Sequence, residues 1–79
     1  MKKFKNNANL LTLGSNIRKQ RNKLGMTQEN LSFEAALDRS YIGGAERGER
    51  NLSILTLSKI AKCLKCDIPK LTKGIPNER

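Results

Sequence analysis

The sequence predicts a compact all-α domain of five helices with no sheet. Three observations support this fold class. Apolar residues recur at helical spacing along most of the chain, residues suited to N-caps precede several of these segments, and glycines follow two of them. No segment shows the alternation of apolar and polar residues that predicts a strand. At 79 residues, the chain is long enough for one small domain.

The first helix is expected to run from residue 10 or 12 to residue 24, with Gly25 as the stop signal just past its end. Its apolar face contains Leu13, Ile17 and Leu24. The basic, asparagine-rich residues 1–9 before it predict a flexible arm, and residues 74–79 predict a polar tail. The helical domain is therefore expected to cover residues 10–73.

The next two helices are predicted in the stretch TQENLSFEAALDRSYIGGAERG, with a helix-turn-helix over about residues 28–47. Thr27 and Asp38 are the expected N-caps. Small residues, Ser32 and Ala36, stand where two crossing helices would come closest. Apolar residues form one buried stripe, made up of Leu31, Ala35, Leu37, Ile42 and Ala45. The opposite side of the second of these helices is therefore free to contact an acceptor-rich partner.

The last two helices are predicted to complete the core. Ser53 caps a fourth helix with Ile54, Leu57, Ile60, Ala61 and Leu64 on its apolar face, and Asp67 caps a short helix through about Thr72. Cys63 and Cys66 form a C-x-x-C, but the chain has no histidine and no second cysteine pair. We therefore expect packing roles for both cysteines, no metal, no cofactor and no enzymatic activity.

The charge balance indicates a polyanionic partner. Sixteen Lys and Arg against seven Asp and Glu give a formal net charge of +9. A membrane surface is the alternative, but there is no long apolar run and no Trp- or Phe-rich basic helix. RNA is weaker than double-stranded DNA because the stacking aromatics of common RNA modules are missing. The start also lacks the apolar run of a secretory signal, so we expect a cytoplasmic protein.

The helix-turn-helix stretch, with the RGERN loop and the apolar helix that follow it, resembles the lambda-repressor-like (Xre) family. LDRSYIGGAERGERNLS is especially similar to the controller proteins of restriction-modification systems, and the resemblance covers roughly residues 13–71. It implies a lambda-repressor-like fold and a sequence-specific transcription regulator that binds a near-palindromic operator as a homodimer. The alternatives are a phage- or plasmid-type repressor and an antitoxin-like protein-interaction module.

The resemblance also implies which residues contact DNA. The third helix would be the recognition helix, with base contacts from Arg39, Ser40, Tyr41 and Gly43. Phosphate contacts would come from Thr27, Gln28, Arg47, Arg50 and Asn51. For Tyr41 the alternative is that it covers the core. Gly43 and Gly44 depart from the family pattern, so they either admit the DNA backbone or are merely tolerated.

Two further contacts are implied by resemblance. Arg21 is expected to pair with Glu46, and deleting one member of such a buried pair is costly. A twofold dimer contact is expected at Leu55, Ile68 and Leu71. RNA polymerase is a further candidate partner, through Glu29 and Glu34 of the second helix. The basic arm is either a solvated tail or lies along a DNA groove.

Overall fold

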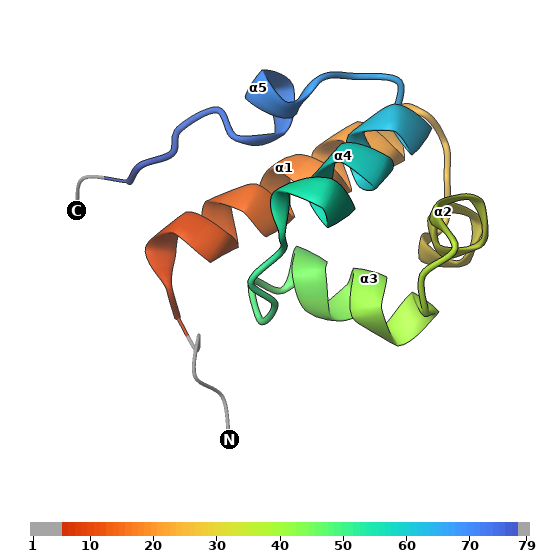
Figure 1. Ribbon diagram of the computed structural model, residues 1–79, viewed down its shortest axis with the longest axis horizontal. Helices are drawn as coiled ribbons and strands as arrows, with labels where there is room; N and C mark the ends of the chain where they lie inside the picture. Colours follow the sequence, from red (N-terminus) through yellow and green to blue (C-terminus); the bar gives the residue numbers. More distant parts are fainter. Residues whose placement is uncertain (1–5, 78–79) are drawn as a thin grey trace.

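The computed structural model describes residues 6–77, and this part of the chain contains five helices and no strand. The helices are α1 (Ala8–Lys23), α2 (Gln28–Ala35), α3 (Arg39–Glu46), α4 (Ile54–Cys63) and α5 (Ile68–Leu71) (Figure 1). The predicted all-α, five-helix fold is therefore confirmed. None of these helices is long and apolar enough to cross a membrane.

The start of α1 differs from the prediction. The helix begins at Ala8 because the side chain of Asn7 accepts a hydrogen bond from the backbone N–H of Leu10, at 3.1 Å. Asparagine is a strong N-cap, so the residues that we expected to oppose regular structure instead start the helix. The predicted flexible arm, residues 1–9, is thus wrong over its last residues. Residues 1–5 lie outside the part that the structure describes.

Side-chain N-caps start three of the other helices as predicted. The cap oxygens accept backbone N–H groups at 2.9 to 3.1 Å, in the pairs Thr27 with Asn30, Ser53 with Thr56, and Asp67 with Lys70. Asp38 occupies the N-cap position of α3 but makes no side-chain cap bond. The first turn of α3 is therefore not fastened in this way.

The core lies between α1, α2, α3, α4 and α5. Its buried apolar residues are Leu13, Ile17, Leu31, Ile42, Leu57, Ile60, Ala61, Leu64 and Leu71, with Cys63 and Cys66 partly buried against them. Two assignments to the core face are wrong, since Leu24 is 37% exposed and Ile54 is 62% exposed. Each lies at an end of its helix, where the chain turns away from the core.

Helices α1 and α3 approach each other closely at Gly14 of α1. A Cβ built on Gly14 would lie only 2.4 Å from the carbonyl oxygen of Ala45 and 2.5 Å from that of Glu46. Glycine is therefore required there for α1 and α3 to touch through their backbones. Ser32 is buried as expected, but Ala36 is exposed and ends α2 in the left-handed conformation (φ 57°), so its predicted role at a helix crossing is wrong.

The C-terminal segment lies back along α1. The amide of Asn16 donates to the carbonyl oxygens of Leu71 and Lys73, at 2.8 and 2.9 Å, and the Asn77 N–H donates to the side chain of Asn9. Ile75 packs partly buried against the core. The prediction of a polar tail from residue 74 is thus wrong for residues 74–77. Figure 1 shows α5 and α3 on opposite sides of α1.

Candidate nucleic-acid interface

One side of helix α3 is buried in the domain, and the residues of its first turn are exposed on the other side. Ile42, Ala45 and Glu46 are almost fully buried against the rest of the domain. Arg39 and Ser40, in the first turn, are exposed. This follows from the apolar spacing of the helix, which leaves the polar residues on the opposite face.

The buried side of α3 is fixed to α1 by an ion pair. Arg21 donates from Nε to Glu46 Oε2 at 2.6 Å and from Nη2 to Glu46 Oε1 at 3.0 Å, and the Glu46 side chain is fully buried. Arg21 also donates from Nη1 to the carbonyl oxygen of Met26, at 2.7 Å. The expected Arg21–Glu46 pair is therefore present, with bidentate geometry that suits a guanidinium and a carboxylate.

The surroundings of Glu46 keep it ionised. Burial alone would raise the pKa of Glu46, but hydrogen bonds from Arg21, Gln28 and Arg18 and the charge of Arg21 outweigh burial and lower this pKa below its usual value. The same carboxylate raises the pKa of Arg21. The pair is thus charged on both sides at neutral pH and holds α1 and α3 in one geometry.

Gln28 connects this buried pair to the exposed start of α3. Its Nε2 donates to Glu46 Oε1 at 2.9 Å, and its Oε1 accepts from Arg39 Nη1 at 3.2 Å. Arg39 is thereby held by a chain of hydrogen bonds that begins at a buried carboxylate. We expected Gln28 only as a phosphate contact, and the sequence gives no signal that its side chain reaches both residues.

The two glycines of α3 have a physical explanation that neither sequence-based alternative included. A Cβ on Gly43 would lie 3.2 Å from Arg47 Nη1 and 3.5 Å from Gln28 Oε1, and one on Gly44 would lie 3.1 Å from Arg50 Nε. The absence of a Cβ at these two positions therefore lets polar side chains lie directly against the backbone of α3. Gly43 is buried beneath Arg47 and Gln28. Its predicted contact with DNA stays a prediction and would need these two side chains to move aside.

The remaining DNA candidates lie on α3, in the loop after it and at the start of α2. The guanidinium of Arg50 lies 5.2 Å from the centre of the Tyr41 ring, which is half-buried and outside the core cluster. Arg47 and Glu49 form a two-bond ion pair at 3.1 and 3.2 Å on the surface. Contacts on α3 thus bring together five of the predicted contact residues, which are Gln28, Arg39, Tyr41, Arg47 and Arg50. Thr27, Ser40 and Asn51 are exposed.

The predicted dimer contact is only partly available. Leu55 is 75% exposed on α4 and Ile68 is half-buried, but Leu71 is 0% exposed. Leu71 belongs to the core of the domain, so its assignment to an interface is wrong. Ile54, next to Leu55, supplies an exposed apolar side chain that we had placed in the core.

No metal site accompanies these residues. Within residues 6–77, no group of three or more His, Cys, Asp or Glu side chains lies close enough to hold a metal ion. Burial raises the pKa of both cysteine thiols, which disfavours reactive thiolates. The chemistry of the site is therefore that of hydrogen-bond donors and positive charge.

Sequence comparison places this arrangement among known regulators. A helix-turn-helix family model matches residues 17–71. The control protein C.SmaI of Serratia marcescens is 42% identical over 69 residues, which cover 85% of this chain and 82% of that protein. The control protein C.BamHI of Bacillus amyloliquefaciens is 47% identical over 60 residues, which cover 75% of this chain and 73% of that protein.

Solved structures give the same result. The restriction-modification controller protein C.AhdI from Aeromonas hydrophila has a TM-score of 0.79 and 42% identity, over 81% of this chain and 97% of that chain. The controller protein C.Esp1396I, crystallised as a tetramer in complex with its natural 35 base-pair operator, has a TM-score of 0.74 and 41% identity. That match covers 81% of this chain and 84% of the C.Esp1396I chain.

Proposed function

This chain belongs to the Xre-type helix-turn-helix family and is closely related to restriction-modification controller proteins, and from this premise we propose that it reads a near-palindromic operator as a homodimer. It is a DNA-binding regulator of the controller type, not an enzyme. We place it in the cytoplasm, where its operator lies.

One observation carries the proposal for how the operator is read. Arg39 and Ser40 are exposed in the first turn of a helix whose opposite side is locked to α1 by the buried Glu46. A helix presented in this way can place its N-terminal side chains in the major groove, where Arg39 can donate two parallel hydrogen bonds to guanine O6 and N7. Gln28 holds the Arg39 guanidinium at this position before DNA arrives.

Backbone contacts would come from the residues around this helix. Thr27, Gln28, Arg47, Arg50 and Asn51 supply hydroxyl, amide and guanidinium donors, which suit phosphate oxygens. Arg47 would have to exchange its carboxylate partner, Glu49, for a phosphate. The Arg47 side chain is exposed and Glu49 is only partly buried, so we expect this exchange to cost little.

The dimer contact that we propose is centred on Leu55 with its neighbour Ile54, and Ile68 lies at its margin. The first two are the large exposed apolar side chains of α4. Two recognition helices related by a twofold axis would enter successive major grooves about 34 Å apart. RNA polymerase is a further proposed partner, through Glu29 and Glu34 on the exposed side of α2.

The experiment that tests the proposal is selection of bound sequences from a random duplex pool, with the wild-type protein and Arg39→Ala. We expect a twofold site from the wild type, and from Arg39→Ala a loss of about 1 to 3 kcal/mol of preference at one guanine in each half. Lys62→Ala, which removes an exposed cation of α4, is the matched control and should keep the full preference.

An unchanged site preference for Arg39→Ala would contradict the proposed base contact. A selected site without twofold symmetry would contradict the homodimer. Both results are read from the same sequences, so the two parts of the proposal are tested separately.

A further inference from the structure

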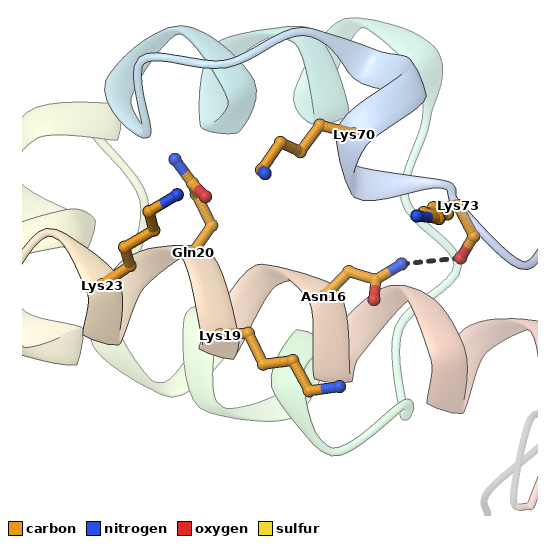
Figure 2. Close-up of a pocket in the computed structure, with 6 residues that line it drawn as sticks. All are labelled: Asn16, Lys19, Gln20, Lys23, Lys70 and Lys73. Atoms are coloured by element: carbon orange, nitrogen blue, oxygen red, sulfur yellow. Dashed lines mark hydrogen bonds between the residues drawn. The ribbon is translucent and has the colours of Figure 1, made fainter.

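A second cationic feature lies between α1 and α5, on the other side of α1 from α3. It is a pocket of about 450 Å³ lined by Asn16, Lys19, Gln20, Lys23, Lys70 and Lys73 (Figure 2). Residues nine apart on an α-helix lie about half a turn apart. Lys23 therefore faces away from Gly14, the residue of α1 that touches α3. The pocket is thus separate from the DNA-reading face.

The pocket gathers positive charge from two elements, and none of the described residues that line it is a carboxylate. Four of these described residues are lysines, and the other two are neutral amides. Figure 2 shows Lys23 of α1 and Lys70 of α5 reaching toward each other, with Gln20 between them. Like charges brought together by the fold repel each other unless an anion lies between them.

Several other cationic groups of the described chain have acidic neighbours. Glu46 accepts from Arg18 and Arg21, and Glu49 accepts from Arg47. A second hollow, which is lined by Lys59 and Lys62, also contains Glu34. Within residues 6–77, the pocket between α1 and α5 therefore differs from the lysine-lined hollow between α2 and α4 by having no carboxylate in its lining.

The neutral side chains of the pocket are held in place. Gln20 is 8% exposed and donates from Nε2 to the carbonyl oxygen of Leu64 at 3.0 Å. Asn16 donates to the carbonyl oxygens of Leu71 and Lys73. These bonds join α1 to the end of α4 and to the end of α5. The elements that carry the lysines are therefore held together without a ligand.

We propose that this pocket binds a compact polyphosphorylated anion, the chemistry that inorganic tripolyphosphate and nucleoside triphosphates share. Lysine ammonium groups bind phosphate oxygens as point charges from several directions. The volume lies within the range of small-ligand pockets, about 300 to 1,000 Å³. The lysines line a hollow, whereas elements that read a duplex project from the surface into a groove.

The inference does not depend on DNA reading, and the amides provide a direct test. Side-chain NH₂ resonances of Asn16 and Gln20 can be followed by ¹⁵N NMR while tripolyphosphate is added to the full chain. We expect saturable shifts of these two signals, and no comparable shift for Asn30 or Asn51. Shifts concentrated on Arg39, Arg47 and Arg50 would overturn the proposal, because the anion would then bind at the DNA face.

A charge-matched pair of variants separates the pocket from net charge. Lys23→Gln/Lys70→Gln should weaken tripolyphosphate binding by about tenfold in calorimetry, since each removed lysine is worth up to about fivefold. Lys59→Gln/Lys62→Gln removes the same charge beside Glu34 and should stay within about twofold of wild type. Equal losses in the two variants would overturn the proposal. The first variant should keep its melting temperature and operator affinity, because both lysines are exposed and away from α3.

Binding of three further ligands, compared with that of tripolyphosphate, shows which class of anion the pocket prefers. Adenosine triphosphate should bind as well as tripolyphosphate if only the phosphates are recognised, and more tightly if the base is also bound; sulfate should bind more weakly than either. Sulfate binding as tight as tripolyphosphate would overturn the polyphosphate assignment. A random-sequence duplex that shifts Asn16 and Gln20, and that tripolyphosphate does not displace, would show that the pocket is a DNA surface instead.

Discussion

The inner face of α3 meets α1 through backbone atoms and a buried ion pair, whereas its outer face is covered by polar side chains. Inside, a Cβ on Gly14 would lie 2.4 Å from a carbonyl oxygen of α3, and Glu46 is fully buried. Outside, the space over Gly43 and Gly44 is taken by the far parts of Arg47, Gln28 and Arg50. Helix α3 is thus held against α1 by close backbone contact and a buried ion pair, while side chains alone cover its other face.

The largest expected effect in this comparison comes from Glu46→Ala. Removing the carboxylate leaves the guanidinium of Arg21 buried without its charge partner, so we expect the free energy of unfolding to fall by about 3 to 5 kcal/mol. Urea denaturation at fixed protein concentration measures this. Gln28 also loses a partner, so Arg39 should become less well positioned.

Two controls accompany this change. Arg21→Met with Glu46→Leu removes both charges together and should cost less than Glu46→Ala alone. Glu49→Ala removes the carboxylate of the exposed Arg47 pair on the outer face and should change stability by no more than about 0.5 kcal/mol. If Glu46→Ala were as harmless as Glu49→Ala, the inner face would not be held by its ion pair.

A smaller loss of stability is expected from Gly14→Ala. Overpacking against the carbonyl oxygens of Ala45 and Glu46 costs up to about 3 kcal/mol. The better helix propensity of alanine returns about 1 kcal/mol. We therefore expect a net loss of about 2 kcal/mol in the same urea measurement. A variant as stable as wild type would show that α1 and α3 can move apart freely, and the contrast between the two faces would not hold.

The fold could be predicted from the sequence wherever the signal is local. Thr27, Ser53 and Asp67 cap their helices as their residue types imply, because an N-cap bond spans only three residues. Helix ends were harder to predict, since Leu24 just after α1 and Ile54 at the start of α4 fit the apolar pattern although the chain there has left the core. Asn7 was assigned to an arm although it caps α1.

The sequence was enough to predict which residues belong to the candidate site, but not which contacts they make with each other. The exposed Arg39 and Ser40 follow from helical spacing, and the pairing of Arg21 with Glu46 came from family resemblance. The bridge made by Gln28 and the helix contact at Gly14 join residues that are far apart in the chain. Such contacts depend on how helices cross, which composition and periodicity do not specify.

The smallest expected effect tests the outer face and has the opposite sign. Gly43→Ala places a Cβ 3.2 Å from Arg47 Nη1, which is the far end of an exposed and flexible side chain. Arg47 can move aside at little cost, so the helix-propensity gain should prevail and raise the free energy of unfolding by about 0.5 to 1 kcal/mol.

The comparison with Gly14→Ala makes this result informative, because the same substitution is made at the two faces of α3. Gly14 of α1 packs against the inner face, and Gly43 lies on the outer face. A stabilised Gly43→Ala beside a destabilised Gly14→Ala would show that only the inner face is closely packed. A loss of stability at Gly43 would instead mean that Gln28 and Arg47 are fixed as firmly as backbone. The outer face would then be as rigid as the inner one, and Arg47 would not be free to exchange Glu49 for a phosphate.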